Sequence, residues 1–596
     1  MNNLNFLVDV LKDSPVFKTL EKNVKPGRTV CASGLSTINK SNIIYALCRL
    51  KGVTAFCLAS DEKEAQTLCN DLSCMGLRAY VYPVRDFNFL DFQSRSHEYE
   101  HARLKVLLKL LNHECDVAIA CVDAAAQLTV PRNVLEQSVI EFEEGRELSL
   151  EKATKALTLL GYERFDAVEG SGQFSLRGGI LDFFMPDSDY PVRCEFWGDE
   201  ITDLSYFDIE TQRRFKKADK ITLSPSTEIV IEDRAALADK IEHKAKLLRS
   251  KNSAKAKEKL FSEAELIRSG AMIANADKFI NQIYDKPESL FDYLDRNTLV
   301  FASEFTAIQE RGKSMDFISN ETLMQGFEDG TLCRGFDRFA LTFNECTEFL
   351  QSHGTIVLEN FVHGSMPIKL SEIISFSTKQ LSAWGGSYKQ LKEDVDGLFT
   401  PESKGVIFAG TERAAKNLCD TFNADGINAV YSEGADKISK GELLVMQGAL
   451  SAGFEYPSQK FFAITYSQVS YRPEKSKKKK KKTGQEIYSL SELAPGDYVV
   501  HNVHGIGVFG GIRKIDTHGV IKDYIKIDYA KGDVLYVPVT QLDMVAKYIG
   551  PKEDSRVKLN RLGSGDWQKA KARVKTSVKD IAKELIELYS QRMKAK

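Results

Sequence analysis

Short apolar runs alternate with amphipathic stretches between residues 29 and 130, and this alternation limits the folds that the N-terminal part can adopt. VCAS (30–33) precedes the amphipathic stretch 41–50, and TAFCLAS (54–60) precedes 62–72. Short apolar runs separated by helical patterns are typical of a parallel sheet covered by helices. We therefore predict an α/β domain here. A chain of 596 residues has room for roughly three to five domains in all.

A run of consecutive lysines, Lys477–Lys482, marks a change in composition. Like charges repel one another and stay solvated, so the surrounding segment is predicted to be a linker. After it, residues 493–548 are dense in Gly, Tyr, Val and Ile and alternate with period two, which predicts a small β-barrel. Residues 567–596 carry an apolar stripe at helical spacing and are predicted to form a helix.

The overall composition excludes several classes of protein. With 81 Lys and Arg against 83 Asp and Glu, the net charge is -2, so any nucleic-acid surface must be local. Eleven cysteines without a CxxC pair predict reduced thiols in a cytosolic protein. The N-terminal stretch carries Asp9 and no basic segment, and no apolar run reaches the roughly 18 residues of a membrane span. We therefore predict a soluble, cytoplasmic protein without membrane contact.

His97, Glu98 and His101 form a literal HExxH pattern. On a helix, two histidines one turn apart can face one zinc ion while the glutamate acts as base. The flanking residues are strongly polar, and the sequence defines no third ligand. A solvated helical turn explains the pattern more simply, so we predict no metal site and no catalytic residue. A zinc hydrolase stays an alternative.

A second pattern lies between a predicted strand and a predicted helix. Residues Gly34 to Ser41 fit the phosphate-loop consensus GxxxxGK[ST], except that Asn39 replaces the second glycine. That glycine lets backbone N–H groups surround a phosphate, whereas asparagine brings a side chain into the cradle. Lys40 is retained, but only Asp123 offers a carboxylate near a strand end for magnesium. We interpret the segment as a degenerate phosphate loop that does not turn over ATP. A purely structural turn is the alternative.

Residues 176–184 and 191–197 read as two neighbouring strands. In the second strand, alternation places Arg193 and Trp197 on one face and the apolar residues between them on the other. Arginine and tryptophan are enriched among the residues that dominate protein interfaces. With Arg177 on the first strand, they are predicted to form a binding surface. A buried tryptophan with an incidental salt bridge is the alternative.

Three segments resemble a known family. RGGILDFFMPDSDYPVRCEFWGDEITDLSYFDIETQRR (177–214) resembles the segment shared by the bacterial transcription-repair-coupling factor and the excision-repair damage-recognition subunit UvrB. LAPGDYVVHNVHGIGVFGGI (493–512) and DYIKIDYAKGDVLYVPV (523–539) resemble the polymerase-interacting module of the same factor, which CarD-type transcription regulators share. Residues 567–592 resemble its relay helix. The chain is therefore identified as a member of the coupling-factor family.

The resemblance implies an α/β and α+β multidomain fold. It consists of a UvrB-like α/β module with an inserted UvrA-binding domain, a further small α/β domain, a small SH3/Tudor-like β-barrel and a C-terminal relay helix. The implied boundaries are 1–130 for the first half of the UvrB-like domain, 131–225 for the insertion, 226–365 for the second half, 366–470 for the variable small domain, 471–489 for the lysine-rich linker, 490–550 for the barrel and 551–596 for the linker and relay helix.

The resemblance also implies two protein partners. The family recruits UvrA through two arginines and an aromatic residue, which correspond here to Arg177, Arg193 and Trp197; the typical aromatic residue is phenylalanine, so Trp197 is a departure. The RNA polymerase β subunit is bound by an exposed aliphatic residue on a barrel strand. Ile515 matches that position, with Lys514 and Arg513 beside it. By simple alternation, Ile515 could equally be a core residue.

In this family, two RecA-like motor domains follow, with a true phosphate loop, ATP and magnesium, and they translocate on double-stranded DNA. The sequence ending at Lys596 contains no such loop. We therefore predict a motor-less N-terminal portion that hydrolyses nothing, needs no cofactor and is monomeric. Its implied function is transcription-coupled nucleotide excision repair: polymerase stalled at a lesion is bound, and the intact protein displaces it and recruits UvrA.

Two further alternatives stay open. The chain could be a free-standing CarD-like regulator of RNA polymerase with an unrelated N-terminal scaffold. It could also be a UvrB-like damage sensor, which the lack of a second motor domain disfavours.

Overall fold

The computed structural model describes residues 4–85, 97–137, 140–209, 211–248, 253–270, 276–362, 366–381, 388–466, 485–486, 496–501, 504–517, 520–538, 545–547 and 559. The chain divides into two compact units, Met1–Tyr471 and Arg472–Lys596, which we call the first and the second unit.

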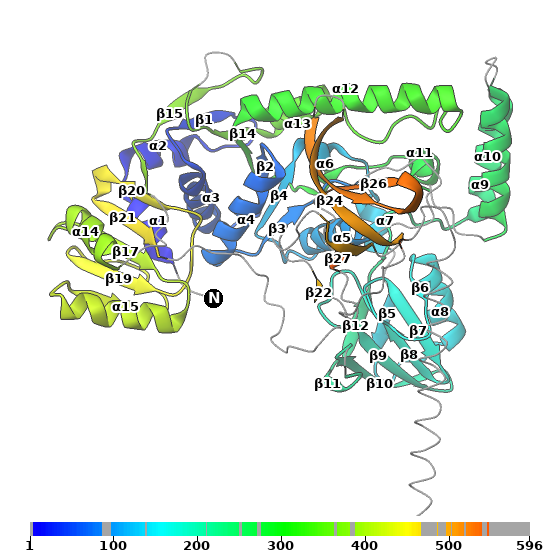
Figure 1. The fold of residues 1–596 in the computed structure, drawn as a ribbon, viewed down its shortest axis with the longest axis horizontal. Coiled ribbons are helices and arrows are strands. Elements are labelled where there is room, and N and C mark those ends of the chain that lie inside the picture. Colours follow the sequence, from blue (N-terminus) through cyan, green and yellow to red (C-terminus); the bar gives the residue numbers. More distant parts are fainter. Residues whose placement is uncertain are drawn as a thin grey trace, which may run out of the picture. The chain divides into compact units, whose positions relative to one another are not determined.

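A seven-stranded parallel sheet organises the first unit (Figure 1), with the strand order β15-β1-β14-β13-β2-β4-β3. The predicted parallel α/β layer is thereby confirmed. Two separate segments of chain build the sheet, and β15 pairs with β1 although it lies beyond residue 365, where the sequence placed the end of this domain. The strands are β1 (Val30–Ser33), β2 (Ala55–Ala59), β3 (Ala79–Tyr82), β4 (Val117–Cys121), β13 (Leu299–Ser303), β14 (Thr355–Leu358) and β15 (Glu372–Ser375).

Both faces of this sheet are covered, and the local sequence shows why. In β1, Val30 and Ala32 enter one hydrophobic core while Cys31 enters another, because successive side chains of a strand point to opposite faces. A strand buried on both faces must be apolar at every position, which explains the uninterrupted apolar runs. The helices of this part are α1 (Asn5–Lys12), α2 (Pro15–Asn23), α3 (Thr37–Lys51), α4 (Glu62–Cys74), α5 (Glu98–Leu111), α6 (Val122–Ala126), α7 (Arg132–Gln137), α12 (Phe305–Asp329) and α13 (Phe343–His353).

An α+β body is inserted between the two halves of the parallel sheet. Its antiparallel core strands belong to a sheet of order β11-β10-β9-β8-β7-β6, and a two-stranded sheet pairs β12 with β5. Phe142 and Leu157 pack with Leu181 and Cys194, so helix α8 and the β5–β12 pair cover one face of the larger sheet. The elements are β5 (Ile140–Glu143), α8 (Leu150–Leu159), β6 (Glu163–Arg164), β7 (Gln173–Arg177), β8 (Ile180–Phe183), β9 (Val192–Trp197), β10 (Glu200–Phe207), β11 (Arg214–Lys217) and β12 (Lys220–Leu223).

A helical segment and a further α/β sheet complete the first unit. The sheet has the order β16-β20-β21-β17-β19-β18. Phe408 and Phe461 of this sheet share one core with Ile43 of α3, so the small sheet is packed against the parallel-sheet domain. The elements are α9 (Arg234–Leu247), α10 (Ser253–Arg268), η1 (Ala276–Phe279), α11 (Ile280–Ile283), η2 (Leu290–Tyr293), β16 (Lys379–Leu381), α14 (Tyr388–Leu398), β17 (Lys404–Phe408), α15 (Glu412–Ala424), β18 (Ala429–Tyr431), β19 (Glu442–Met446), β20 (Gly453–Tyr456), η3 (Pro457–Gln459) and β21 (Phe461–Thr465).

The second unit is a small β structure with the strand order β22-β27-β23-β24-β25-β26. Ile525 and Ile527 of β25 are fully buried, which confirms that these alternate residues share the core face. The predicted relay helix lies outside the described residues. The elements are β22 (Gln485–Glu486), β23 (Tyr498–His501), β24 (Gly505–Thr517), β25 (Val520–Asp528), η5 (Ala530–Gly532), β26 (Val534–Pro538) and β27 (Val545–Lys547).

The structure bears on the predictions about membrane spans and about the cysteines. Within the described ranges, no helix has both the length and the apolar character needed to cross a membrane. All eleven cysteines are free thiols, and ten of them are buried. Burial raises the pKa of the Cys57 thiol well above its ordinary value, as expected for structural rather than reactive thiols.

Candidate functional site

The open face of the inserted sheet is the candidate site, and alternation along β9 defines it. Cys194 and Phe196 are buried, whereas Arg193 is partly exposed and Trp197 is fully exposed. The two faces predicted for this strand are therefore confirmed. β9 pairs with β8 on one side and β10 on the other, so its outward side chains lie in the middle of the sheet.

A buried carboxylate connects the two predicted arginines. Asp182 of β8 is paired with Arg193 in the ladder, and its side chain is only 1% exposed. Arg193 binds it in bidentate fashion, with Nε 2.7 Å from Oδ1 and Nη2 2.8 Å from Oδ2. Arg177 Nη2 donates to the same Oδ2 at 2.6 Å. The structure thus brings Arg177 and Arg193 together on one acceptor.

The two arginines differ in what they leave accessible. Arg193 is 13% exposed, its guanidinium carbon lies 4.4 Å from the ring centroid of Phe207, and it also donates to Gln212. Arg177 is 48% exposed and lies at the end of β7. Arg193 is therefore part of the sheet, whereas Arg177 faces solvent.

Trp197 ends β9 and is 82% exposed, so the alternative of a buried tryptophan is wrong. Gly198 follows it with φ +65°, a conformation that favours glycine and turns the chain into β10. The preceding amide, Phe196 N, donates to Gly179 O at 2.8 Å. Trp197 therefore lies beside the β7–β8 turn, at the same end of the sheet as Arg177.

Sequence reasoning missed the ion pairs that organise this face. Asp182 was not singled out, although alternation in GGILDFF places it opposite the core residues Leu181 and Phe183. Arg214 was also missed: it forms ion pairs with Glu195 and Asp203 on the same sheet. Each pairing joins different strands, and the residue spacing carries no signal for it.

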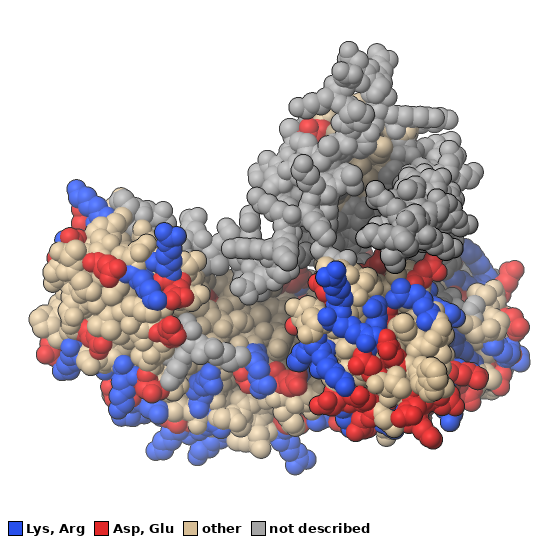
Figure 2. Space-filling view, turned by 90° about the horizontal axis from the view of Figure 1, so that it is seen from below, with Lys and Arg blue, Asp and Glu red and all other residues tan. Residues whose placement is uncertain are grey.

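On the surface that Figure 2 displays, basic and acidic side chains of the described residues are intermixed. A nucleic-acid site would show a predominantly basic patch. The candidate site itself is defined by particular side-chain pairs and by one exposed indole ring.

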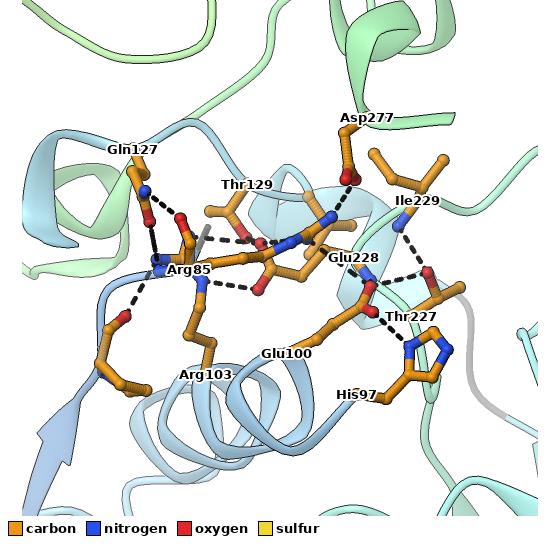
Figure 3. A network of polar contacts seen from close by, with 12 residues as sticks. Arg85, His97, Glu100, Arg103, Gln127, Thr129, Thr227, Glu228, Ile229 and Asp277 are labelled. Atoms are coloured by element: carbon orange, nitrogen blue, oxygen red, sulfur yellow. Dashed lines mark hydrogen bonds and ion pairs between the residues drawn. The ribbon is translucent and has the colours of Figure 1, made fainter. Parts of the chain in front are cut away.

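A buried ionic network anchors the segment that leaves the inserted body (Figure 3). Arg103 of α5 is fully buried, with Nε 2.6 Å from Glu228 Oε1 and Nη2 3.3 Å from Oε2. Arg85 Nη1 lies 3.4 Å from Glu228 Oε2 and 3.6 Å from Glu100 Oε1, and Arg85 also pairs with Asp277. Two cations thus face three carboxylates at the point where the insertion rejoins the parallel-sheet domain.

Of the HExxH residues, His97 belongs to this network. His97 Nδ1 lies 2.9 Å from Glu100 Oε2, and this hydrogen bond raises the pKa of His97. Burial would raise the pKa of Glu100, but Arg85 and His97 hold it well below its usual range. Among the described residues no group of three or more His, Cys, Asp or Glu side chains could hold a metal ion. His97 is thus engaged by Glu100, a residue inside the motif, which gives the zinc interpretation no support.

In the segment predicted to be a degenerate phosphate loop, the lysine and a backbone amide are engaged by other residues of the protein. Lys40 Nζ lies 2.6 Å from Glu304 Oε1, 2.9 Å from Ser303 Oγ and 3.3 Å from Glu64 Oε1, which matches its three N–H donors. The backbone amide of Gly34 donates to Asn360 O at 3.2 Å. A phosphate would need both the lysine and such amides to be accessible.

The other residues of this loop serve packing. Asn39 is fully buried in the first turn of α3 and accepts a hydrogen bond from Ser36 Oγ at 2.6 Å. Ser41 Oγ donates to the carbonyl oxygen of Thr37 at 3.2 Å and lies 3.4 Å from Asp71 Oδ2. The loop therefore starts a helix that is buried nearly throughout.

In the second unit, the predicted polymerase-binding residues lie on β24. In the β24–β25 ladder, Ile515 pairs with Lys522 and Lys514 with Asp523; the side chains at 514 and 515 lie outside the described residues. Arg513 is exposed and pairs with Tyr524. The ladder has an irregularity between Phe509 and Ile512, just before these positions.

Comparisons with known proteins agree with this geometry. The family model of the UvrB interaction domain matches residues 140–229, which span the inserted body. The model of the CarD-like/TRCF RID domain matches residues 493–549 in the second unit.

The transcription-repair-coupling factor of Bacillus subtilis is 30% identical over 602 residues, covering 98% of this chain and 51% of the relative. The chain is homologous to the transcription-repair-coupling factors. Those of Staphylococcus haemolyticus and Staphylococcus aureus USA300 are 29% and 26% identical, covering 86% and 99% of this chain and 44% and 51% of the relatives. The resemblance seen in the sequence is thus confirmed, and the chain spans about half the length of the curated relatives that it matches.

Proposed function

We propose that this chain is the interaction portion of a transcription-repair-coupling factor. It binds RNA polymerase stalled at a DNA lesion through the second unit, and it recruits UvrA through the open face of the inserted sheet. The match of a UvrB interaction domain and a CarD-like domain within one homologue of the coupling factors supports this function. The predicted domain boundaries, the closure of the second unit into an SH3/Tudor-like barrel and the relay helix are parts of the proposal.

The exposed indole of Trp197 beside Arg177 is the observation that carries the UvrA assignment. Among the described residues, Trp197 is the most exposed large apolar side chain, at 82%, and a partner that covered it would remove this apolar surface from water. Tryptophan and arginine are the residue types that most often dominate binding energy. UvrA is the partner because residues 140–229 match the UvrB interaction domain.

The polymerase assignment rests on β24, where Ile515 would contact the β subunit, flanked by Lys514 and Arg513. Arg513 is exposed on this strand. The ladder with β23 ends at Val508, whereas residues 512–517 of β24 pair with β25. A strand segment paired on one side suits recognition by strand pairing with a partner.

We further propose that displacement of polymerase by ATP-driven translocation on double-stranded DNA belongs to motor domains outside this chain. The chain acts as a monomer, uses no cofactor and hydrolyses no ATP. The ion pairs of Lys40 with Glu64 and Glu304 support this assignment because they occupy the group that would bind a phosphate.

Binding to UvrA is tested with Trp197→Ala in the full chain. The affinity is expected to fall about 30-fold or more, since an interface hot spot contributes at least about 2 kcal/mol. Phe317→Ala is the matched control, because Phe317 is also an exposed aromatic residue (57%) but lies on α12. Equal loss of binding in both variants, or no loss in Trp197→Ala, would contradict the proposed surface.

Binding to polymerase is tested by co-elution with a β-subunit fragment. Ile515→Arg should abolish co-elution, while Val534→Arg, at an exposed aliphatic position on the edge strand β26, should retain it. Circular dichroism checks that both variants are folded. If folded wild type fails to co-elute, the second unit does not bind polymerase through this subunit.

The remaining alternatives make different predictions. A free-standing CarD-like regulator would not bind UvrA, and the alignment with a coupling factor over 98% of the chain argues against an unrelated N-terminal scaffold. A zinc hydrolase would contain stoichiometric zinc, which metal analysis of the purified protein measures directly.

A further inference from the structure

The two arginines of the candidate site have different environments, and this difference separates their roles. We propose that Arg193 is a positioning residue that neutralises Asp182, and that Arg177 is the arginine that meets the partner. This inference rests on the proposed binding of UvrA. The matching surface on UvrA is a carboxylate next to an apolar patch, placed to meet Arg177 and Trp197.

Arg193 has little left to offer a partner. A guanidinium has five N–H donors. Four of them are used here: Nε and Nη2 donate to Asp182 at 2.7 and 2.8 Å, Nη1 donates to Gln212 O at 3.1 Å, and Nη2 donates to Gln212 Oε1 at 3.0 Å. Gln212 has φ +57°, so the turn that supplies both oxygens adopts a conformation uncommon for a residue other than glycine. With Phe207 beneath its guanidinium, Arg193 is enclosed by its own domain.

Arg177 is in the opposite situation. Its Nη2 donates one hydrogen bond to Asp182 Oδ2 at 2.6 Å, and about half of its side chain is exposed. This single bond fixes the direction of the side chain but leaves most donors of the guanidinium accessible. A preorganised arginine loses less conformational entropy on binding than a free one.

The charge balance explains why two arginines share one carboxylate. Asp182 is only 1% exposed, so its negative charge needs a close cation. Arg193 supplies that cation by bidentate pairing, the strongest form of the interaction. Arg177 is therefore not consumed in neutralising Asp182, and one positive charge is left at the surface beside Trp197.

Loss of Arg193 should act through Asp182. Without Arg193, the buried carboxylate would draw Arg177 into a bidentate pair and withdraw its donors from the partner. Arg193→Met is therefore expected to weaken UvrA binding about 10-fold. This loss is as large as that of a contact residue, although Arg193 itself makes no contact with UvrA. Removing the carboxylate as well, in Arg193→Met/Asp182→Asn, should release Arg177 and bring the affinity back to within about 3-fold of wild type.

The experiment is a titration of UvrA against the full-length chain and these variants, with Arg177→Ala, Trp197→Ala and Arg146→Met in the series. Arg177→Ala should weaken binding at least about 10-fold. Arg146→Met is the matched control, because Arg146 is also an exposed arginine of the inserted body but pairs with Glu141 of β5, in the β5–β12 pair that covers the other face of the sheet. It should change the affinity less than about 3-fold, as is usual outside hot spots.

The outcomes separate the two proposals. If wild type does not bind UvrA, the proposed function fails and the roles of the arginines lose their meaning. If wild type binds but the double variant is as weak as Arg193→Met, Arg193 contacts UvrA directly and the inference is overturned. An Arg193→Met variant with unchanged affinity overturns it too. If Arg193→Met does not fold, the double variant tests the inference by itself, because it lacks the unpaired buried charge. Binding that is retained in the double variant supports the inference. Binding that is lost while hydrogen exchange in β8 and β9 stays native refutes it.

Discussion

Replacing Arg103 by methionine tests the ionic network that joins the inserted body to the parallel-sheet domain. Methionine matches the unbranched stem of arginine as far as Nε and keeps an apolar, polarisable side chain near the Tyr82 ring, whose centroid lies 4.2 Å from the guanidinium carbon of Arg103. The substitution removes the charge that pairs with Glu228, which is 1% exposed. It also removes the donor to Gln127 Oε1 at 2.8 Å.

The structure gives a magnitude for this change. Breaking a buried ion pair by removing one partner costs about 3–5 kcal/mol, because a buried charge is left uncompensated. Glu228 would retain Arg85 Nη1 at 3.4 Å and the hydroxyl of Thr129 at 2.8 Å, so the lower end applies. A loss of about 3 kcal/mol raises the opening equilibrium of this junction about 100-fold.

Hydrogen exchange measures the opening directly. The amide of Glu228 donates to Glu100 Oε1 at 2.8 Å and that of Val230 donates to Tyr284 Oη at 2.9 Å, so both report on the junction. Their exchange should accelerate about 100-fold in Arg103→Met. Amides of β17, in the small α/β sheet, should change far less.

Arg132→Met is the matched control, since Arg132 pairs with Glu136 and Asp295 at the surface. Exposed pairs contribute about 1 kcal/mol or less. The double variant Arg103→Met/Glu228→Gln should recover part of the loss, because it leaves no unpaired charge. Exchange in Arg103→Met that is no faster than in the control would refute the view that this network holds the junction.

Three pH effects follow from groups in both units. The hydrogen bond with Glu100 raises the pKa of His97. The stability that this bond adds is therefore present below the pKa of the unfolded state and is lost as pH rises through the raised value. The melting temperature should fall between pH 6 and 8, and His97→Gln should remove this pH dependence. Burial and the nearby charge of His504 lower the pKa of His501 to about 4. The melting temperature of the second unit should therefore decrease as pH falls from about 6.5 towards 4. A melting temperature that stays constant over this range would contradict the prediction. Burial raises the pKa of Asp71 to about 6, so the charged form of Asp71 destabilises the fold. The stability of Asp71→Asn relative to wild type should therefore increase between pH 4 and 7. A stability difference that does not change with pH would show that Asp71 does not titrate in this way.

Local pattern was enough for much of the fold. The apolar runs at 30–33 and 54–60 are buried parallel strands, because a strand covered on both faces needs an apolar side chain at every position. Alternation in β9 separated the outward Arg193 and Trp197 from the core residues, because side-chain direction in a strand depends only on position along it. These features follow from neighbours in the chain, and so does the family resemblance, which rests on contiguous segments.

Partners far apart in the chain were decided by the tertiary structure alone. Lys40 meets Glu304 because β1 and β13 end at the same edge of the parallel sheet, and Arg103 meets Glu228 because the inserted body returns beside α5. The same holds for Asp182, whose bond to Arg193 depends on the pairing of β8 with β9. The sequence determined which residue types face outward or inward, whereas strand order and burial decided which charges are neutralised within the protein and which, like Arg177, are left for a partner.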